Sequence, residues 1–179
     1  MTTSAFPPIP EAAWRRDFDA PRDPSHRPKA DGYFDGGSLN GLPLGGIGTG
    51  GVGRDWTGAF RRWTLKPGAL KYFTEAANCF AVFQQIEGQP PQATVLCPRE
   101  EEHGRSLAAW GWPASPLEGY YAALFPKAWY VYPAAANRPV EMVCEQFSPV
   151  LPHRYEEASL PVGLFRWRLH NLADRPVKV

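Results

Sequence analysis

The sequence predicts an all-β fold, an antiparallel β-sandwich, and three observations support this prediction. Twenty prolines and 17 glycines cut the 179 residues into short segments, which favours strands and loops over long helices. Several segments alternate apolar and polar residues, which is the period of a strand with one buried face. No stretch shows the longer apolar period of an amphipathic helix. Short strands separated by proline and glycine are typical of a sandwich.

The first part of the chain, residues 1–31, is predicted to be a proline-rich arm that lies over a β-sandwich domain at 32–179. Residues 11–18 are expected to form a helical turn, and the turn must be short because Pro10 and Pro21 bound the segment closely. Trp14 and Phe18 are four residues apart and are expected to anchor the arm.

Residues 41–54 contain seven of the 17 glycines. Glycine reaches positive φ at low cost and lets another surface approach the backbone closely. The pattern G-x-G-x-x-G at 48–53 would bind a dinucleotide if a buried strand preceded it and a helix followed. Pro43 and its neighbouring glycines are expected to interrupt any strand, and no helical period follows. The stretch therefore predicts a tight loop at the edge of a β domain, with its backbone against a neighbouring surface.

The later strands are expected to follow one another between turn residues. Segments 79–86 and 94–97 are expected to pair as a hairpin across a Gly- and Pro-containing connection. Further strands are expected at 60–65, 129–132, 141–147 and 162–172. The side chains expected to be buried are Phe80, Val82, Trp129, Phe165, Trp167 and Leu169.

The last three residues, 177–179, follow a turn and begin a new alternating strand. This strand is expected to pair with 162–172 as a hairpin. Because the sequence ends three residues into the strand, most of the edge of 162–172 would have no partner. The chain is therefore expected to be a piece of a larger protein, with a sandwich that is incomplete at its C-terminal end.

Composition argues against several kinds of function. The net charge of +1 gives no reason to expect a nucleic acid or an anionic membrane as partner, and no apolar run is long enough to span a bilayer. Cys79, Cys97 and Cys144 form no C-x-x-C motif, so neither a zinc site nor a disulfide framework is expected. Buried thiols in a reducing compartment are the expected state. We therefore expect a cytoplasmic chain without metal or cofactor.

Three sequence blocks, 41–63, 124–132 and 149–163, carry a resemblance to a known family. Together and in this order they resemble the N-terminal region of glycoside hydrolase family 116, the non-lysosomal glucosylceramidases and related bacterial β-glucosidases. The resemblance runs from about Asp31 to the last residue. It implies a β-sandwich followed by a much larger catalytic (α/α)6 helical domain, which this chain lacks.

The resemblance also implies an activity, the retaining hydrolysis of a β-glucoside. The implied nucleophile and acid/base are carboxyl groups of the helical domain, and no position here matches either, so no catalytic residue is expected in this chain. The acidic runs 100–102 and 156–157 are interpreted as solvated loop faces, because retaining catalysis needs two carboxyl groups about 5 Å apart, one with a raised pKa. The isolated chain is expected to be inactive, with the catalytic domain and, through it, the β-glucoside as partners.

The predicted site is the glycine loop with its flanking residues, at the domain interface or the edge of the substrate path. Arg62 precedes Trp63, and the pair is either a surface cation beside an aromatic ring or a contact to the helical domain. The residues assigned to the site are Gly45, Gly46, Gly48, Gly50, Gly51, Arg54, Arg62 and Trp63.

An alternative function is a stand-alone carbohydrate- or protein-binding β-sandwich module. Trp110 and Trp112 would then form a sugar-stacking platform, although packing in the core or an interface is the favoured interpretation. His153, in a polar loop after Pro152, is expected to be structural.

Overall fold

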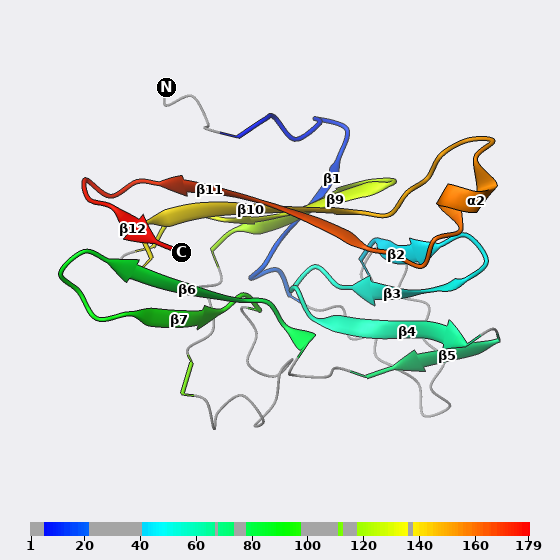
Figure 1. Ribbon diagram of the computed structural model, residues 1–179, viewed down its shortest axis with the longest axis horizontal. Coiled ribbons are helices and arrows are strands. Elements are labelled where there is room, and N and C mark those ends of the chain that lie inside the picture. The colour runs from blue at the N-terminus through cyan, green and yellow to red at the C-terminus, as the bar shows by residue number, and fades with distance from the viewer. Residues whose placement is uncertain are drawn as a thin grey trace.

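The computed structural model of the chain is an antiparallel β-sandwich (Figure 1). One layer is a five-stranded sheet, and the facing layer consists of a four-stranded and a three-stranded sheet side by side. Within the part of the chain that the structure describes, the one helix is the short α2 (Tyr155–Ala158). The all-β prediction is confirmed. The described residues are 6–21, 41–66, 68–73, 78–97, 111–112, 118–135 and 138–179.

The five-stranded sheet contains the strands expected at 129–132, 141–147 and 162–172. All its neighbouring strands are antiparallel, and β10 pairs along its full length with β11. Its order is β1 (Trp14–Asp17), β8 (Tyr120–Leu124), β9 (Lys127–Tyr132), β10 (Val140–Phe147) and β11 (Leu164–Asn171).

The helical turn expected at 11–18 is wrong, because this segment forms the edge strand β1. Trp14 lies opposite Ala123 and Asp17 opposite Tyr120, so the backbone groups of β1 pair with β8. Phe18 is fully buried against Tyr132, with ring centroids 5.2 Å apart, whereas Trp14 remains 40% exposed. Phe18 is therefore the anchor of this segment.

The facing layer contains the expected hairpin, with Ala81 opposite Val95. The C-terminal strand has a different partner from the one expected, because Val177 pairs with Ile86 in the facing layer and not with β11. The side chain of Asn171 closes the intervening turn by accepting from the Ala173 amide and donating to the Arg175 carbonyl oxygen. The strands are β2 (Pro43–Gly46), β3 (Gly50–Arg54), β4 (Phe60–Lys66) and β5 (Ala69–Tyr72) in one sheet, and β12 (Val177–Lys178), β6 (Ala81–Ile86) and β7 (Gln92–Val95) in the other.

The main core lies between the two layers. Val82 is buried in this core as expected. Phe80, Phe165 and Trp167 were also expected to be buried, but they are only partly buried and pack against the core. Leu169 was expected to be buried, but it is 49% exposed: it lies on β11, the outermost strand of its sheet, where the facing layer leaves it uncovered.

A second, smaller cluster lies on the outer face of the five-stranded sheet. Trp129 is buried there with Val143, and Phe6 and Ile9 of the N-terminal segment pack over them. The N-terminal segment therefore covers apolar surface that the sandwich core does not reach.

Replacing Trp167 by alanine is expected to lower the free energy of unfolding by about 3 kcal/mol, the lower end of the range for a large aromatic side chain. Its ring meets Phe80 edge-on at 5.3 Å and stacks on Tyr132 at 6.2 Å, and these contacts would be lost. Leu169→Ala, two residues along the same strand, is the matched control and is expected to change stability little. Urea unfolding followed by circular dichroism measures both, and equal losses would contradict the assignment.

Candidate domain interface at the glycine hairpin

The glycine-rich stretch is a β-hairpin formed by β2 and β3. Leu44 pairs with Val52 and Gly45 with Gly51, and the turn lies between the two strands. The expectation that Pro43 prevents a strand is wrong: β2 is the edge strand of its sheet, where proline at the first position costs no ladder hydrogen bond. The run that follows β3 enters strand β4 and not a helix. The hairpin therefore lacks the strand–loop–helix context of a dinucleotide site.

The close backbone approach predicted for the glycines occurs within this domain. A Cβ atom on Gly46 would collide with the carbonyl oxygen of Ser159, and one on Gly45 with that of Gly50 in the partner strand. Gly48, at the turn with a φ of 77°, has open space where its Cβ would be. Packing inside the sandwich thus accounts for the glycines of the strands, and Gly48 is the position that faces outward.

Two hydrogen bonds join the hairpin to the end of α2, and a third joins it to Ser148, directly after β10. The Ile47 amide donates to the Ala158 carbonyl oxygen at 2.9 Å. The Thr49 hydroxyl donates to the Ser159 carbonyl oxygen at 2.8 Å. The Gly45 amide donates to the Ser148 hydroxyl at 2.8 Å. The turn and α2 accordingly lie at the same end of the sandwich (Figure 1).

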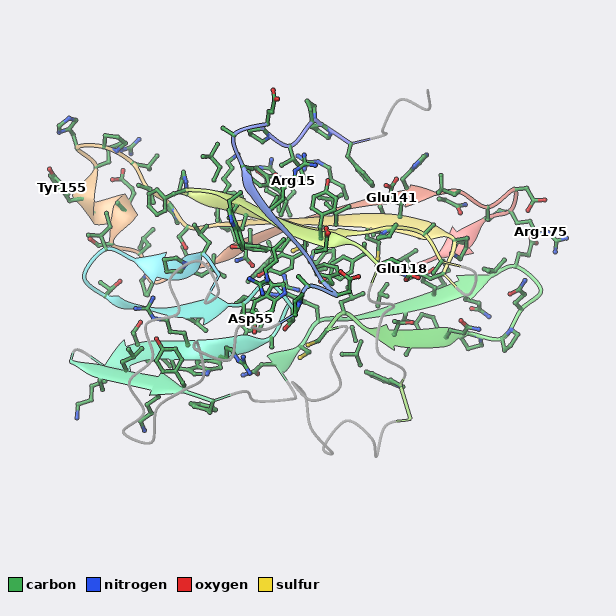
Figure 2. All side chains as sticks on the ribbon, turned by 180° about the vertical axis from the view of Figure 1, so that it is seen from behind. Arg15, Asp55, Glu118, Glu141, Tyr155 and Arg175 are labelled. Atoms are coloured by element: carbon green, nitrogen blue, oxygen red, sulfur yellow. The ribbon has the colours of Figure 1, made fainter. Side chains whose placement is uncertain are left out.

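A hollow of about 340 Å³ opens at this end of the molecule. It is lined by the backbone of the hairpin together with Thr64, Phe125, Pro126 and Val150. We call five exposed apolar side chains of the hairpin turn, the β8–β9 connection and the segment around α2 the hairpin end. Ile47 and Phe125 line the hollow, and the exposed fractions of all five lie between 41% and 71%. The hairpin end consists of Ile47, Phe125, Leu151, Tyr155 and Leu160. Figure 2 shows Tyr155 on this outer end of the sandwich and Asp55 between its layers.

Arg54, assigned to the exposed edge of the site, is instead fully buried in the core. Its Nε donates to the Gly58 carbonyl oxygen at 2.9 Å and its Nη2 to the Tyr132 hydroxyl at 3.1 Å. Its guanidinium carbon lies 3.9 Å from the ring centroid of Tyr130 and 4.8 Å from that of Phe80. Burial alone would lower the pKa of Arg54, but the neighbouring Tyr132, Tyr130 and Cys144 raise it above its ordinary value. Arg54 is a charged centre of the core and holds several strands together.

Two tyrosines of β9 complete this buried polar cluster. The Tyr130 hydroxyl donates toward the carbonyl oxygens of Arg54 and Asp55, at 2.8 and 2.7 Å. The Tyr132 hydroxyl donates to the carbonyl oxygen of Leu96 at 3.1 Å. Leu96 directly follows β7 of the three-stranded sheet. Burial raises the pKa of both hydroxyls, so they stay protonated and act as donors.

Asp55 shapes the turn that follows Arg54. Its Oδ1 accepts hydrogen bonds from the Thr57 amide, the Thr57 hydroxyl and the Ala59 amide. Its Oδ2 lies 3.4 Å from Nη1 of Arg61, so the buried carboxylate is paired with a cation from β4. These contacts fix the direction in which the chain enters β4.

Arg62 and Trp63 lie on β4, next to the hairpin. Trp63 stacks on Phe73 with ring centroids 5.2 Å apart, and its indole nitrogen donates to the Phe73 carbonyl oxygen. Arg62 is half-buried opposite Gly53. The site residues therefore belong to one four-stranded sheet. Of its strands and turns, the β2–β3 turn contributes a side chain, that of Ile47, to the hairpin end. Their contact with another domain stays a prediction.

The remaining sequence candidates give no catalytic arrangement among the described residues. Glu156 and Glu157 lie on α2 toward solvent, where Glu157 pairs with Arg154. His153 is exposed in the preceding turn with a φ of 64°. Trp112 is 42% exposed, so of the two expected alternatives packing in the core is wrong and packing in an interface stays a prediction. Trp110 and the acidic run 100–102 lie outside the described residues.

The described part of the chain contains no cluster of histidine, cysteine or acidic side chains that could hold a metal ion. No helix within the described ranges has the length and apolar character needed to cross a membrane.

The fold and its glycine hairpin define a class, an antiparallel β-sandwich domain with a polar core centred on Arg54. The model of one family, described as the N-terminal domain of beta-glucosidase 2, glycosyl-hydrolase family 116, matches residues 41–179. The chain therefore belongs to the family of glycoside hydrolase family 116 N-terminal domains, as its three sequence blocks indicated.

Sequence reasoning missed Tyr130 and Tyr132 as partners of Arg54, and it missed the role of Asp55 in the turn before β4. A signal was present: Tyr130 and Tyr132 alternate with valine in a predicted strand, so both hydroxyls lie on one face. A buried tyrosine hydroxyl needs a hydrogen-bond partner, and this requirement could have indicated a polar cluster in the core.

Proposed function

We propose that this chain is the N-terminal domain of a β-glucosidase or glucosylceramidase-like glycoside hydrolase and that it packs against a catalytic (α/α)6 helical domain through the hairpin end. The observation that carries this proposal is the set of exposed apolar side chains at the hairpin end, of which Ile47 and Phe125 line the hollow at the glycine hairpin. Large exposed apolar side chains on neighbouring segments are typical of a place where another protein surface binds. Family membership supplies the kind of partner, because the matched family consists of N-terminal domains of glycoside hydrolases.

The proposed role of the sandwich is structural. The strand glycines and the bonds to Ser148, Ala158 and Ser159 hold the hairpin rigidly. Its outward-facing turn then presents Ile47 and Gly48 to the helical domain. The β-glucoside would be bound and cleaved by that domain, with the sandwich forming one wall of the path to it.

We also propose a cytoplasmic location. The structure has no disulfide among Cys79, Cys97 and Cys144, and Cys97 and Cys144 are buried. Reduced cysteines are the usual state in a reducing compartment.

The test uses a full-length enzyme that contains this chain, with the double variant Ile47→Ser/Tyr155→Ser at the hairpin end. If the two domains pack through this surface, the variant should lose about tenfold or more in the hydrolysis of an aryl β-glucoside, equivalent to about 1.4 kcal/mol. Calorimetry should show that the sandwich melts separately from the helical domain.

Phe83→Ser is the matched control, because Phe83 is 48% exposed but lies on β6, away from the hairpin. It should leave activity and melting unchanged. Full activity of the double variant, or a greater loss for Phe83→Ser, would reject the hairpin end as the docking surface. Saturable binding of an oligoglucoside to the sandwich, unaffected by the double variant, would instead support a carbohydrate-binding module.

A further inference from the structure

Cys79 and Cys97 are distant in the sequence but lie opposite each other in the fold. Strands β6 and β7 pair with Ala81 opposite Val95. The ladder continues one step beyond the strands, because the Leu96 amide donates to the Phe80 carbonyl oxygen at 2.7 Å. The next pair in the same register is Cys79 and Cys97.

Residues directly opposite in an antiparallel ladder have Cα atoms roughly 4.5–5.5 Å apart, within the range of about 4.4–6.8 Å that a disulfide bridges. Side chains of such a pair also point to the same face of the sheet. Both cysteines pack in one small cluster with Ala59 and Val95. The register therefore places the two thiols where a disulfide can form without moving a strand.

The two thiols differ in exposure and acidity. Cys97 is fully buried, whereas Cys79 is only partly buried and can meet a reagent from solvent. The hydrogen bond with the Cys97 thiol lowers the pKa of Cys79; burial opposes this effect and the charge of Arg54 assists it. The thiolate is the form of cysteine that attacks a disulfide. In contrast, burial raises the pKa of Cys144.

We propose that Cys79 and Cys97 form a reversible cross-strand disulfide, with Cys79 as the attacking thiol and Cys97 as the resolving thiol. The oxidant is a small-molecule disulfide such as oxidised glutathione. The Cys79 thiolate bonds to one glutathione sulfur, the S–S bond breaks, and the other glutathione leaves as a thiolate that takes up a proton. Cys97 loses its proton and attacks the Cys79 Sγ, and the second glutathione leaves and is protonated. Two protein thiols are oxidised and one glutathione disulfide is reduced to two thiols.

The bridge would tie the ends of β6 and β7 together beside the polar core. Leu96, next to Cys97, supplies the carbonyl oxygen near the Tyr132 hydroxyl. Closing the loop between the cysteines restricts the unfolded chain, so the oxidised domain should be more stable than the reduced one.

The test is oxidation of the full 179-residue chain with oxidised glutathione. Thiols counted under denaturing conditions should fall from the three cysteines to one, and the mass should fall by two hydrogen atoms. Peptide mapping should identify a Cys79–Cys97 link, and the melting temperature should rise by roughly 5–10 °C.

Cys144→Ala is the matched control and should still lose two thiols, whereas Cys79→Ser should lose none. The peptide map of the unmodified sequence decides the question even where a variant fails to fold. Three thiols that persist through oxidation, a lasting glutathione adduct on Cys79, or a bridge that includes Cys144 would each overturn the proposal.

Discussion

Replacing Arg54 by leucine is expected to remove about 3–5 kcal/mol from the free energy of unfolding through orphaned polar groups and lost cation–π contacts, a large part of the roughly 5–15 kcal/mol that holds a domain folded. The guanidinium is fully buried and joins β3 to Tyr132 of β9 and to the turn at Gly58. Leucine would leave the Tyr132 hydroxyl with one partner fewer and the Gly58 carbonyl oxygen without this donor. A buried polar group left without a partner costs about 1–3 kcal/mol. The contacts of the guanidinium with the rings of Tyr130 and Phe80 would be lost as well.

Chemical denaturation of the chain measures the loss, and Arg15→Leu is the matched control. Arg15 also lies over a tyrosine ring, 5.0 Å from the centroid of Tyr120, but it is exposed on β1. Its replacement should cost less than about 1 kcal/mol, as is usual for surface cations. Arg54→Lys keeps the charge but not the planar fork, and it should also destabilise the domain strongly. Equal small losses for Arg54→Leu and Arg15→Leu would show that the buried cluster adds no stability.

The strands that could be predicted from sequence are those whose burial follows a local pattern. Segments 129–132, 141–147 and 162–172 alternate regularly, and each forms a strand at nearly the expected bounds. The hairpin of β6 and β7 was predictable because its short connection holds the turn residues. In these cases the local sequence and the final packing favour the same structure.

The elements that were missed depend on partners far away in the chain. β1 carries Arg15, Arg16 and Asp17, which give no apolar alternation, and it becomes a strand because the edge of β8 pairs with it. β12 joins β6 and not β11 because the turn after Asn171 directs the chain into the facing layer. No periodicity within either segment contains this information.

The close packing of the glycine stretch was predictable, but the residues that it contacts were not. The glycines did indicate close approach of the backbone, and the surface approached includes Ser159 of the same domain. Arg54 was assigned to the site as the last residue of the glycine stretch, but it is fully buried in the core. Its partners Tyr130 and Tyr132 come from a distant strand, so only the folded structure brings them together.

Replacing Gly46 by alanine is expected to cost about 2–4 kcal/mol, in the range of steric overpacking in a filled core. The new Cβ would collide with the carbonyl oxygen of Ser159, a backbone atom that cannot move aside like the end of a side chain. The hairpin would have to shift away from α2, which would strain the bonds from Ile47 to Ala158 and from Thr49 to Ser159. Thermal or urea unfolding of the chain measures this loss.

Gly48→Ala is the matched control in the same hairpin, since its Cβ would meet open space. It should cost about 1 kcal/mol, because only the positive φ of 77° is unfavourable for alanine. The contrast should change in a full-length enzyme if the turn contacts the helical domain. A side chain at Gly48 would then also obstruct the interface. Gly48→Val should therefore reduce the glucosidase activity of the full-length enzyme strongly, although it lowers the stability of the isolated chain only slightly. Equal losses for Gly46→Ala and Gly48→Ala in the chain would mean that conformational strain, and not packing against Ser159, determines where the hairpin needs glycine.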